Sequence, residues 1–215
     1  MQGMFISFEG PDGAGKTSVI NAVRNWLTAK YGDQKVLLTR EPGGNHIAEQ
    51  IREILFDDQN TNMDARTEAL LFAAARRQHI VEDIEPALQV GKIVLSDRYV
   101  DSSVAYQGGG RHLGTDDIWE LNQFAMHGLL PELTIYLDVP SELGLERISK
   151  HRSNQVNRLD REKLKFHQDV RAAYLTLVKR HQKRIQLIDA SQPLAMVVEM
   201  VKATIQQRLK AKDGC

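Results

Sequence analysis

A glycine-rich segment near the N-terminus has the residue types and spacing of a phosphate-binding loop. It fits the pattern G-x-x-x-x-G-K-[ST] and consists of Gly10, Pro11, Asp12, Gly13, Ala14, Gly15, Lys16 and Thr17. Glycines let the backbone turn so that successive N–H groups point at phosphate oxygens, and the following helix directs its positive end at the same anion. Lys16 can reach the terminal phosphates, and the Thr17 hydroxyl can bind Mg²⁺. The segment therefore predicts a site for a nucleoside triphosphate, or at least for a phosphate.

Charged residues also follow two later apolar runs. Arg40 comes directly after the run 36–39, and Ser96, Asp97 and Arg98 follow the next run, 93–95. Strand ends in open α/β sheets face the ligand crevice, where an arginine can bind a phosphate through two parallel hydrogen bonds. Asp97 is placed to hold a Mg²⁺-bound water, and an acid beside a base suits a site for two phosphate-bearing substrates. For Arg40, the alternative is a surface ion pair with Glu41 or another neighbour.

An aromatic residue and an arginine share one face of a predicted helix. Phe72 and Arg76 are four residues apart, and three alanines separate them. A ring beside a guanidinium can stack on a nucleobase and donate hydrogen bonds to its edge. The alternative is that Phe72 belongs to the hydrophobic core, where an aromatic residue at helical spacing usually lies.

Short apolar runs alternate with longer amphipathic segments. The runs are continuous, as in strands covered on both faces, and lie at 4–8, 36–39, 93–95, 133–139 and 185–188. Helical patterns cover 16–30, 45–56, 64–89, 115–126, 141–150, 160–184 and 193–210. This β-α-β order predicts an α/β fold with a five-stranded parallel sheet and helices on both faces.

The composition indicates a single globular domain over residues 1–215. Hydrophobic residues are 42% and charged residues 26%, enough for a core and ordinary for such a domain. Lys plus Arg and Asp plus Glu are both 28, and this balance argues against a protein that grips duplex nucleic acid. A single cysteine, Cys215, and the lack of a long apolar stretch predict a cytoplasmic protein without a membrane span.

Three segments in this order strongly resemble the thymidylate kinase family. They are residues 8–17 (FEGPDGAGKT), 39–44 (TREPGG) and 97–108 (DRYVDSSVAYQG), and the resemblance extends from about residue 4 to 209. It implies a P-loop nucleoside-monophosphate kinase fold with strand order 2-3-1-4-5. It also implies Mg²⁺-dependent transfer of the γ-phosphoryl group of ATP to dTMP, giving dTDP for dTTP synthesis. A homodimer is expected from the same resemblance, with the helix predicted at 64–89 as a candidate contact.

The resemblance implies roles for individual side chains of the dTMP site. Arg40 and Arg98 look like the pair that holds and aligns the dTMP phosphate, and Arg52 resembles a further arginine on the phosphate side. Asp12 looks like the carboxylate that meets the 3′-hydroxyl of dTMP and the metal. Tyr106 looks like the steric gate beneath the sugar that disfavours a 2′-hydroxyl. The residues that resemble base contacts are Phe72, stacked on thymine, and Arg76, Ser103 and Gln107 at its edge.

The polar segment 151–161 carries several basic residues between two predicted helices and indicates a mobile surface segment. Phosphoryl transfer needs positive charge around the transferring group. Some thymidylate kinases carry an arginine inside the P-loop, but this loop has none. The chain thus resembles the bacterial type, in which a mobile lid, here at about 150–161, supplies the catalytic arginine. Arg158 is the first choice and Arg152 the second, and Arg147 resembles the arginine that lies against adenine.

Other classes of function fit the sequence less well. A kinase for another small acceptor, such as another nucleoside monophosphate or a deoxynucleoside, is one alternative. A bare nucleoside, however, carries no phosphate for Arg40 and Arg98 to bind. A regulator that uses ATP as a switch would have no acceptor. A nucleic-acid motor is disfavoured by the charge balance and the size. The guanine-reading motif N-K-x-D is missing from the sequence, and the 7 histidines lack the spacing of metal ligands.

Overall fold

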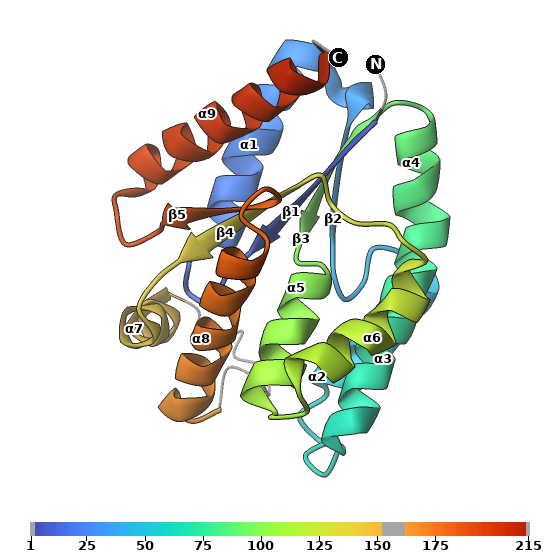
Figure 1. Ribbon diagram of the computed structural model, residues 1–215, viewed down its shortest axis with the longest axis vertical. Helices are drawn as coiled ribbons and strands as arrows, with labels where there is room; N and C mark the ends of the chain where they lie inside the picture. The colour runs from blue at the N-terminus through green and yellow to red at the C-terminus, as the bar shows by residue number, and fades with distance from the viewer. Residues whose placement is uncertain (1–2, 152–161, 214–215) are drawn as a thin grey trace.

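The computed structural model describes residues 3–151 and 162–213. Within these residues, five strands form one sheet in the order β2-β3-β1-β4-β5, and each neighbouring pair is parallel (Figure 1). The strands are β1 (Met4–Glu9), β2 (Val36–Arg40), β3 (Ile93–Asp97), β4 (Leu133–Asp138) and β5 (Ile185–Asp189). The predicted fold class and strand order are confirmed.

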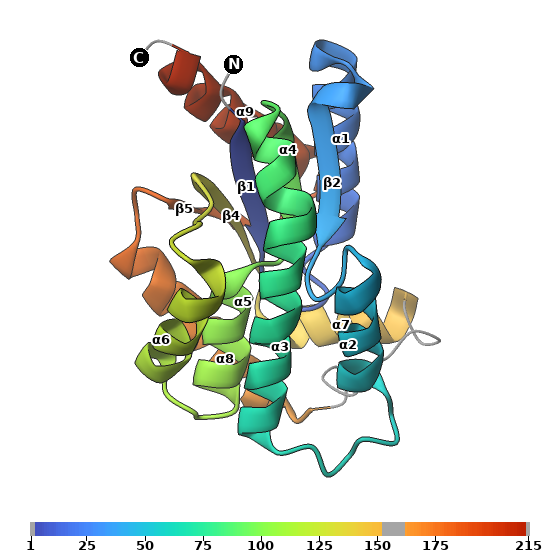
Figure 2. The same ribbon diagram turned by 90° about the vertical axis from the view of Figure 1, so that its right-hand side faces the viewer.

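Helices connect the strands and cover both faces of the sheet, as Figures 1 and 2 show. In the described part of the chain they are α1 (Lys16–Tyr31), η1 (Asp33–Lys35), α2 (His46–Phe56), α3 (Ala65–His79), η2 (Ile80–Ile84), α4 (Glu85–Gln89), α5 (Val100–Ser103), η3 (Val104–Gly110), α6 (Thr115–Met126), α7 (Ser141–His151), α8 (Leu164–Arg180) and α9 (Leu194–Asp213). Here η1 is a 3₁₀ helix, and η2 and η3 are π-helical.

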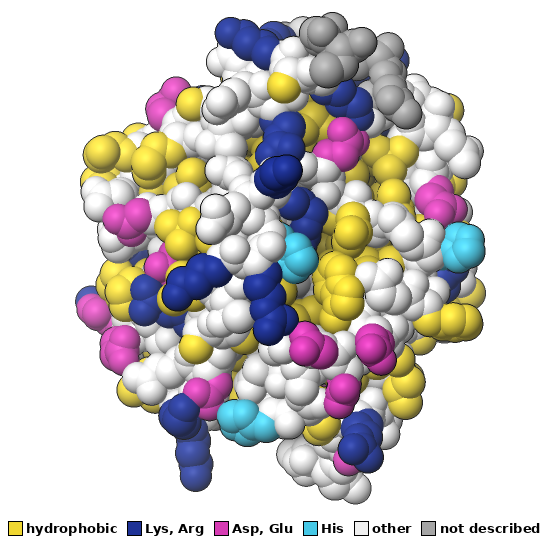
Figure 3. Space-filling model, in the orientation of Figure 1, with side chains coloured by type: hydrophobic (Ala, Val, Ile, Leu, Met, Phe, Trp, Pro, Cys, Tyr) yellow, Lys and Arg dark blue, Asp and Glu magenta, His cyan; other side chains and the backbone are white. Residues whose placement is uncertain are grey.

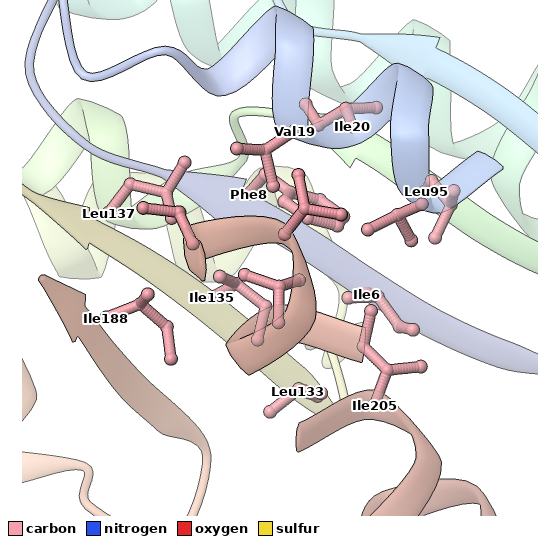
Figure 4. Close-up of a cluster of buried hydrophobic side chains, with 14 of the residues drawn as sticks. Ile6, Phe8, Val19, Ile20, Leu95, Leu133, Ile135, Leu137, Ile188 and Ile205 are labelled. Atoms are coloured by element: carbon pink, nitrogen blue, oxygen red, sulfur yellow. The ribbon is translucent and has the colours of Figure 1, made fainter. Parts of the chain in front are cut away.

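The sheet separates two hydrophobic cores. Side chains alternate along β1, so that Met4, Ile6 and Phe8 join a core with α1 and α9, whereas Phe5 joins a core with α3, α6 and α8. Figure 4 shows the first core, in which Phe8 lies beside Val19 of α1. Full burial of such a side chain stabilises the fold by about 1.5–3 kcal/mol. Packing on both faces therefore fixes the strands whose ends carry the charged residues.

Two predicted helices differ from the structure in detail. The helix predicted at 64–89 consists of α3, η2 and α4, and helical backbone angles continue through Ile80 and Glu85. The helix predicted at 160–184 begins at Leu164 in the described residues and ends at Arg180, because His181 leaves the helical conformation. Element type was therefore predicted correctly in both segments, whereas residues 162–163 and 181–184 of the second predicted helix are not helical.

The helix formed by α5 and η3 was not predicted. It ends in three glycines, a composition that is unusual inside a helix. A Cβ on Gly109 would lie 2.6 Å from the Cβ of Ala173, and one on Gly110 would lie 2.6 Å from the Phe166 ring. Glycine thus lets η3 pack closely against α8. This packing fixes the helix that carries Ser103 and Gln107.

The surface mixes charges of both signs. Figure 3 shows basic, acidic and hydrophobic side chains interspersed over one face of the molecule. This pattern agrees with a formal net charge of +0. No helix among the described residues is long and apolar enough to cross a membrane.

Candidate active site

A cavity of about 950 Å³ lies where β1, β2 and β3 end. Residues 12–19 line its floor, and further side chains come from α2, α3 and α7. Figure 1 shows α7 on one side of these strand ends and α2 and α3 on the other. Ligand crevices in open parallel sheets form at this edge. The topology therefore gathers segments that are far apart in the sequence around one space.

The loop between β1 and α1 has the geometry of an anion cradle. Gly13 has a φ of 79°, and a Cβ there would lie 2.1 Å from the carbonyl oxygen of Gly144, so that only glycine fits. Gly15 also has a positive φ and directly precedes α1, whose N-terminus has no side-chain cap. Residues 14–18 line the cavity, so the first turn of α1 presents its N–H groups to a ligand there.

Lys16 is buried within this cradle. Its Nζ atom donates to the carbonyl oxygens of Gly10 at 2.9 Å and of Pro11 at 3.0 Å. Burial, and after it the nearby charge of Arg98, lowers the pKa of Lys16 from 10.5 to about 8. The carbonyl oxygens of Gly10 and Pro11 thus hold the lysine side chain. Gly10 and Pro11 do not themselves line the cavity, whereas Lys16 does. The site therefore holds a cation that bound phosphate would stabilise.

Arg98 links the cradle to the neighbouring wall. Its Nη2 donates to Asp12 at 2.6 Å and to the Tyr106 hydroxyl at 3.1 Å, and the Tyr106 hydroxyl donates to the other Asp12 oxygen at 2.8 Å. Nη1 bonds to Gly10 and to Ser102, each at 3.1 Å. Arg98 has a φ of 72°, a left-handed conformation that is costly for a non-glycine residue and is often found at functional sites. Three of the predicted site residues thus form one network.

Arg40 and Arg52 lie at the edge of the cavity. Arg40 is 54% exposed and pairs with both carboxylate oxygens of Glu49 at 2.9 Å. The alternative of a surface ion pair is therefore realised, with Glu49 as the partner. Arg52 donates to the carbonyl oxygen of Pro42 at 2.8 Å and lies 4.6 Å from the Phe56 ring centroid. Both guanidinium groups line the same cavity as Arg98.

The wall formed by α3 holds Phe72 and Arg76. Phe72 lines the cavity and packs edge-on against Phe56, so it serves both the cavity and the packing of α2 on α3. Arg76 is 2% exposed and donates to Glu41 at 2.8 Å, to Ser103 at 3.1 Å and to Asn122. The buried side chains of Ser103 and Gln107 belong to the same wall.

Glu41 was missed as a positioning residue for this wall. It follows Arg40 in the sequence and reads as a surface acid, yet it is 5% exposed. Besides the bond from Arg76, it accepts a 3.1 Å hydrogen bond from Nδ1 of the buried His79. Its pairing with Arg76 depends on the approach of α3 to the end of β2, and the sequence alone carries no signal of that approach.

Thr17 and Asp97 fit a magnesium site. Both line the cavity, and Oδ1 of Asp97 is buried without a hydrogen-bond partner among the described residues. Those residues form no cluster of three acidic, histidine or cysteine side chains that could hold a metal. Mg²⁺ bound to nucleotides usually takes one or two protein groups, with phosphates and waters completing the shell. The donors present match that pattern.

Of the three arginines predicted in and before the lid, only Arg147 belongs to the described residues. Arg147 of α7 lines the cavity, and its guanidinium donates to the carbonyl oxygens of Ala190 at 3.0 Å and Gly13 at 3.4 Å. It thus joins α7, the P-loop and the segment after β5. Arg152, Arg158 and most of the lid predicted at about 150–161 lie outside the described residues.

Glu9, at the end of β1, is a buried acid to which the sequence analysis gave no role. It accepts hydrogen bonds from the Tyr99 amide at 2.7 Å, from Ser102 at 2.5 Å and from the Tyr174 hydroxyl at 3.0 Å. Burial, and after it the charge of Asp101, raises the pKa of Glu9 from 4.5 to about 8. Glu9 thus supports the Ser102 hydroxyl to which Arg98 donates.

Replacement of Glu9 by glutamine is expected to flatten the pH dependence of stability. Because the folded pKa is raised, this group's contribution to the free energy of unfolding is full below about pH 4.5 and is lost as the pH rises to about 8. Urea unfolding followed by tryptophan fluorescence between about pH 5 and pH 8 measures the slope. Glu132→Gln, a change in a surface ion pair, should keep the wild-type slope. Equal slopes for wild type and Glu9→Gln would contradict the prediction.

Comparisons with known proteins place the chain in a family. A family model described as thymidylate kinase matches residues 8–201. Thymidylate kinases of Limosilactobacillus reuteri and Leuconostoc citreum are 66% and 59% identical over 208 and 211 residues, covering 97% and 98% of this chain and 98% of each relative. The crystal structure of thymidylate kinase from Ehrlichia chaffeensis is 32% identical and covers 96% of this chain and 99% of its own, with a TM-score of 0.78. With this fold and this sequence similarity, the chain belongs to the thymidylate kinase family.

Proposed function

We propose that this chain binds ATP and dTMP in the one cavity at the strand ends and transfers the γ-phosphoryl group between them. As a member of the thymidylate kinase family it is a phosphotransferase that converts dTMP to dTDP for dTTP synthesis. The placement of both nucleotides in one cavity is supported by a contact between two parts of the site. Arg98 bonds at once to the P-loop residue Asp12 and to Tyr106 in the neighbouring wall, so donor and acceptor sites meet at this arginine.

The donor site is the P-loop with α1 and α7. The first-turn N–H groups of α1 bind the phosphates, and Lys16 leaves the loop carbonyls to neutralise the terminal phosphate oxygens. Thr17 and Asp97, the latter through a bound water, would hold Mg²⁺, which supplies positive charge to the phosphates. Arg147 lies against adenine, between the P-loop and the segment after β5.

The acceptor site is the wall of α2, α3, α5 and η3. Arg98, with Arg40 and Arg52, holds the dTMP phosphate, because arginine binds phosphate through paired hydrogen bonds. Asp12 meets the 3′-hydroxyl, and Tyr106 fills the space that a 2′-hydroxyl would need. The base contacts are stacking on Phe72 and hydrogen bonds from Arg76, Ser103 and Gln107. Arg40 must share or exchange its present partner, Glu49, when the phosphate enters.

A lid arginine completes the proposal. The P-loop of this chain contains no arginine, so the charge that develops on the transferring group needs another cation. We assign this role to Arg158, with Arg152 as the second choice, by resemblance to the bacterial members of the family. Both lie outside the described residues. The single cysteine, at position 215, supports a cytoplasmic location for the reaction.

Acceptor-dependent release of ADP tests the proposed function. Mg·ATP is incubated with the enzyme and, separately, with dTMP, dUMP, UMP, CMP, AMP, GMP and thymidine. Strong stimulation by dTMP, with weaker stimulation by dUMP and none by thymidine, is the expected result. Stimulation by another monophosphate would keep the phosphate clamp but overturn the base contacts. ATP binding without stimulation by any acceptor would favour a nucleotide-dependent regulator.

We also propose that the chain forms a homodimer through α3 and α6. Leu70, Val81 and Phe124 are 56%, 38% and 90% exposed, and a subunit interface would remove this apolar surface from water. Leu70 and Val81 fall on one stripe of the α3–η2 helix, and Phe124 belongs to α6, which packs on α3. Arg77 ties the two helices together by donating to the carbonyl oxygen of Ala125 at 3.4 Å. The exposed side chains thus lie on two helices that pack against each other.

Phe124→Glu is expected to convert the dimer to a monomer, because a carboxylate at the centre of an apolar interface loses its hydration. Sedimentation velocity of the wild type and the variant over a range of concentrations measures the mass. Leu187→Glu, on the exposed edge of the sheet in β5, is the matched control and should leave the dimer intact. A wild type that sediments as a monomer would refute the dimer itself. A dimer that survives Phe124→Glu would place the interface elsewhere.

A further inference from the structure

We propose that Glu68 is a positioning residue that sets the base specificity of the acceptor site. Its buried carboxylate holds the side-chain amide of Gln107 so that the amide oxygen faces the base. The site then requires a hydrogen-bond donor on the ring. This inference rests on the proposed function, since Gln107 meets a base only if the cavity takes a nucleotide along this wall.

Glu68 is fixed behind the wall of the cavity rather than in it. It lies one helical turn before Phe72 on α3 and is 1% exposed, and the cavity lining does not include it. Its Oε1 accepts a 2.9 Å hydrogen bond from Nε2 of Gln107. Arg111 donates to both oxygens, from Nε and from Nη2, at 3.3 Å each. The guanidinium thereby stabilises the charged carboxylate in a place where water has little access.

Arg111, which binds this carboxylate, is itself held by other parts of the chain. Arg111 follows η3, and its Nη1 donates to Glu162 at 2.5 Å. The guanidinium also lies 5.0 Å from the ring centroid of Phe166, which belongs to α8. Glu68 is therefore held by a cation that is itself anchored twice. A carboxylate held in this way can fix the rotamer of the residue that binds to it.

The partner of Gln107 decides which way its amide turns. An ionised carboxylate only accepts hydrogen bonds, whereas a side-chain amide has one donating and one accepting end. Gln107 therefore meets Glu68 with its nitrogen, because a turned amide would bring two oxygens together and lose a charge-assisted bond. Gln107 lines the cavity, and its Oε1 accepts no hydrogen bond from the described residues. The oxygen is thus the end that remains for a ligand.

The two side chains proposed to contact the base edge, Arg76 and Gln107, then differ in their hydrogen-bonding groups. Arg76 offers only donors, and three of its five N–H groups are used by Glu41, Asn122 and Ser103. Gln107 offers an acceptor. A ring with a carbonyl beside an N–H, as in thymine and uracil, matches this pair. Cytosine presents an amino group and an unprotonated nitrogen in those places, so both contacts would fail.

The dTMP:dCMP ratio of kcat/KM tests the proposal. Glu68→Gln offers Gln107 a donor as well as an acceptor and so permits the amide to turn. We expect the ratio to fall by about tenfold or more, as for the loss of one buried hydrogen bond, with little change in dTMP:dUMP. In a Gln107→Leu background, the same change should have no further effect on the ratio. Asp138→Asn, which removes the bidentate partner of Arg171 outside the cavity, is the control.

The outcomes separate the inference from the function on which it rests. A Glu68→Gln enzyme that loses kcat/KM equally for dTMP and dCMP would show a merely structural role and overturn the inference alone. A wild type without dTMP-dependent ADP release would overturn both. If Glu68→Gln does not fold, Glu68→Asp keeps the charge for Arg111 but withdraws it from Gln107. The same fall in the ratio is then expected, and an unchanged ratio would overturn the inference.

Discussion

Replacement of Lys16 by methionine is expected to lower kcat/KM for Mg·ATP by about a thousandfold while leaving the fold intact. Methionine keeps most of the apolar stem that is buried against the P-loop but removes the ammonium group. The Lys16 side chain is 8% exposed, so its charge acts in a medium that screens it weakly. No other lysine lines the cavity wall formed by the described residues, so no second ammonium group there replaces it.

The pH dependence of wild-type activity provides a second test of the role of Lys16. The protonated form of Lys16 binds phosphate, and its pKa in the free protein is lowered to about 8. We therefore expect kcat/KM for ATP to fall as the pH rises above about 8, because the free enzyme loses the charge. The effect on kcat should be smaller, since bound phosphate favours the protonated lysine.

Steady-state kinetics and thermal unfolding of wild type and Lys16→Met measure both expectations. Lys35→Met, in η1, is the matched control, because it removes the same charge from the surface at the other end of α1. A loss below about tenfold for Lys16→Met would show that the helix N-terminus alone carries phosphate binding. A large fall in thermal stability would instead trace the lost activity to unfolding.

The sequence was sufficient to predict the sheet and the phosphate cradle because both are local patterns. Each strand is an apolar run bounded by polar residues, and parallel order follows from the helices between the runs. The cradle is contiguous, so its spacing is visible without the fold. The position of Arg40 and Arg98 at the cavity was predictable for a related reason, since residues that follow strands in such a sheet face the same edge.

The supporting acids could not be predicted because their roles come from distant partners. Glu9, Glu41 and Glu68 each read as ordinary charged residues in the sequence. Glu9 acquires its role from Ser102 and Tyr174, and Glu68 from Gln107. These partners approach only when α3, α5 and α8 pack together. The helix of α5 and η3 was missed because its local sequence is misleading. Three consecutive glycines disfavour helix unless close packing offsets the cost.

The largest loss of stability is expected from Arg76→Met. The guanidinium is buried and bonds to Glu41, Ser103 and Asn122. Its removal leaves the Glu41 carboxylate buried with its charge no longer balanced by the arginine. Breaking a buried pair in this way costs about 3–5 kcal/mol, which is a large part of the stability of an ordinary domain. The same change removes a base contact of the proposed acceptor site.

A second substitution separates the uncompensated charge from the loss of packing. Glu41→Gln in the Arg76→Met background removes the orphaned charge and retains an amide that His79 can bond. We expect this double variant to recover a large share of the lost stability, so that the two changes are strongly non-additive. Urea unfolding followed by tryptophan fluorescence gives the free energies for the full cycle. Additive effects would show that Arg76 stabilises the fold through packing rather than charge.

Arg24→Met is the matched control, because Arg24 pairs with Asp33 at 3.4 Å and both side chains are well exposed. A surface pair of this kind contributes about 0–1 kcal/mol, so the variant should be almost as stable as the wild type. The contrast isolates burial as the cause, since each variant loses one arginine that is paired with one acid. If Arg76→Met and Arg24→Met lost the same small amount, water would have to reach Glu41 as easily as it reaches Asp33, and the buried ion pair could not be what fixes the wall of α3.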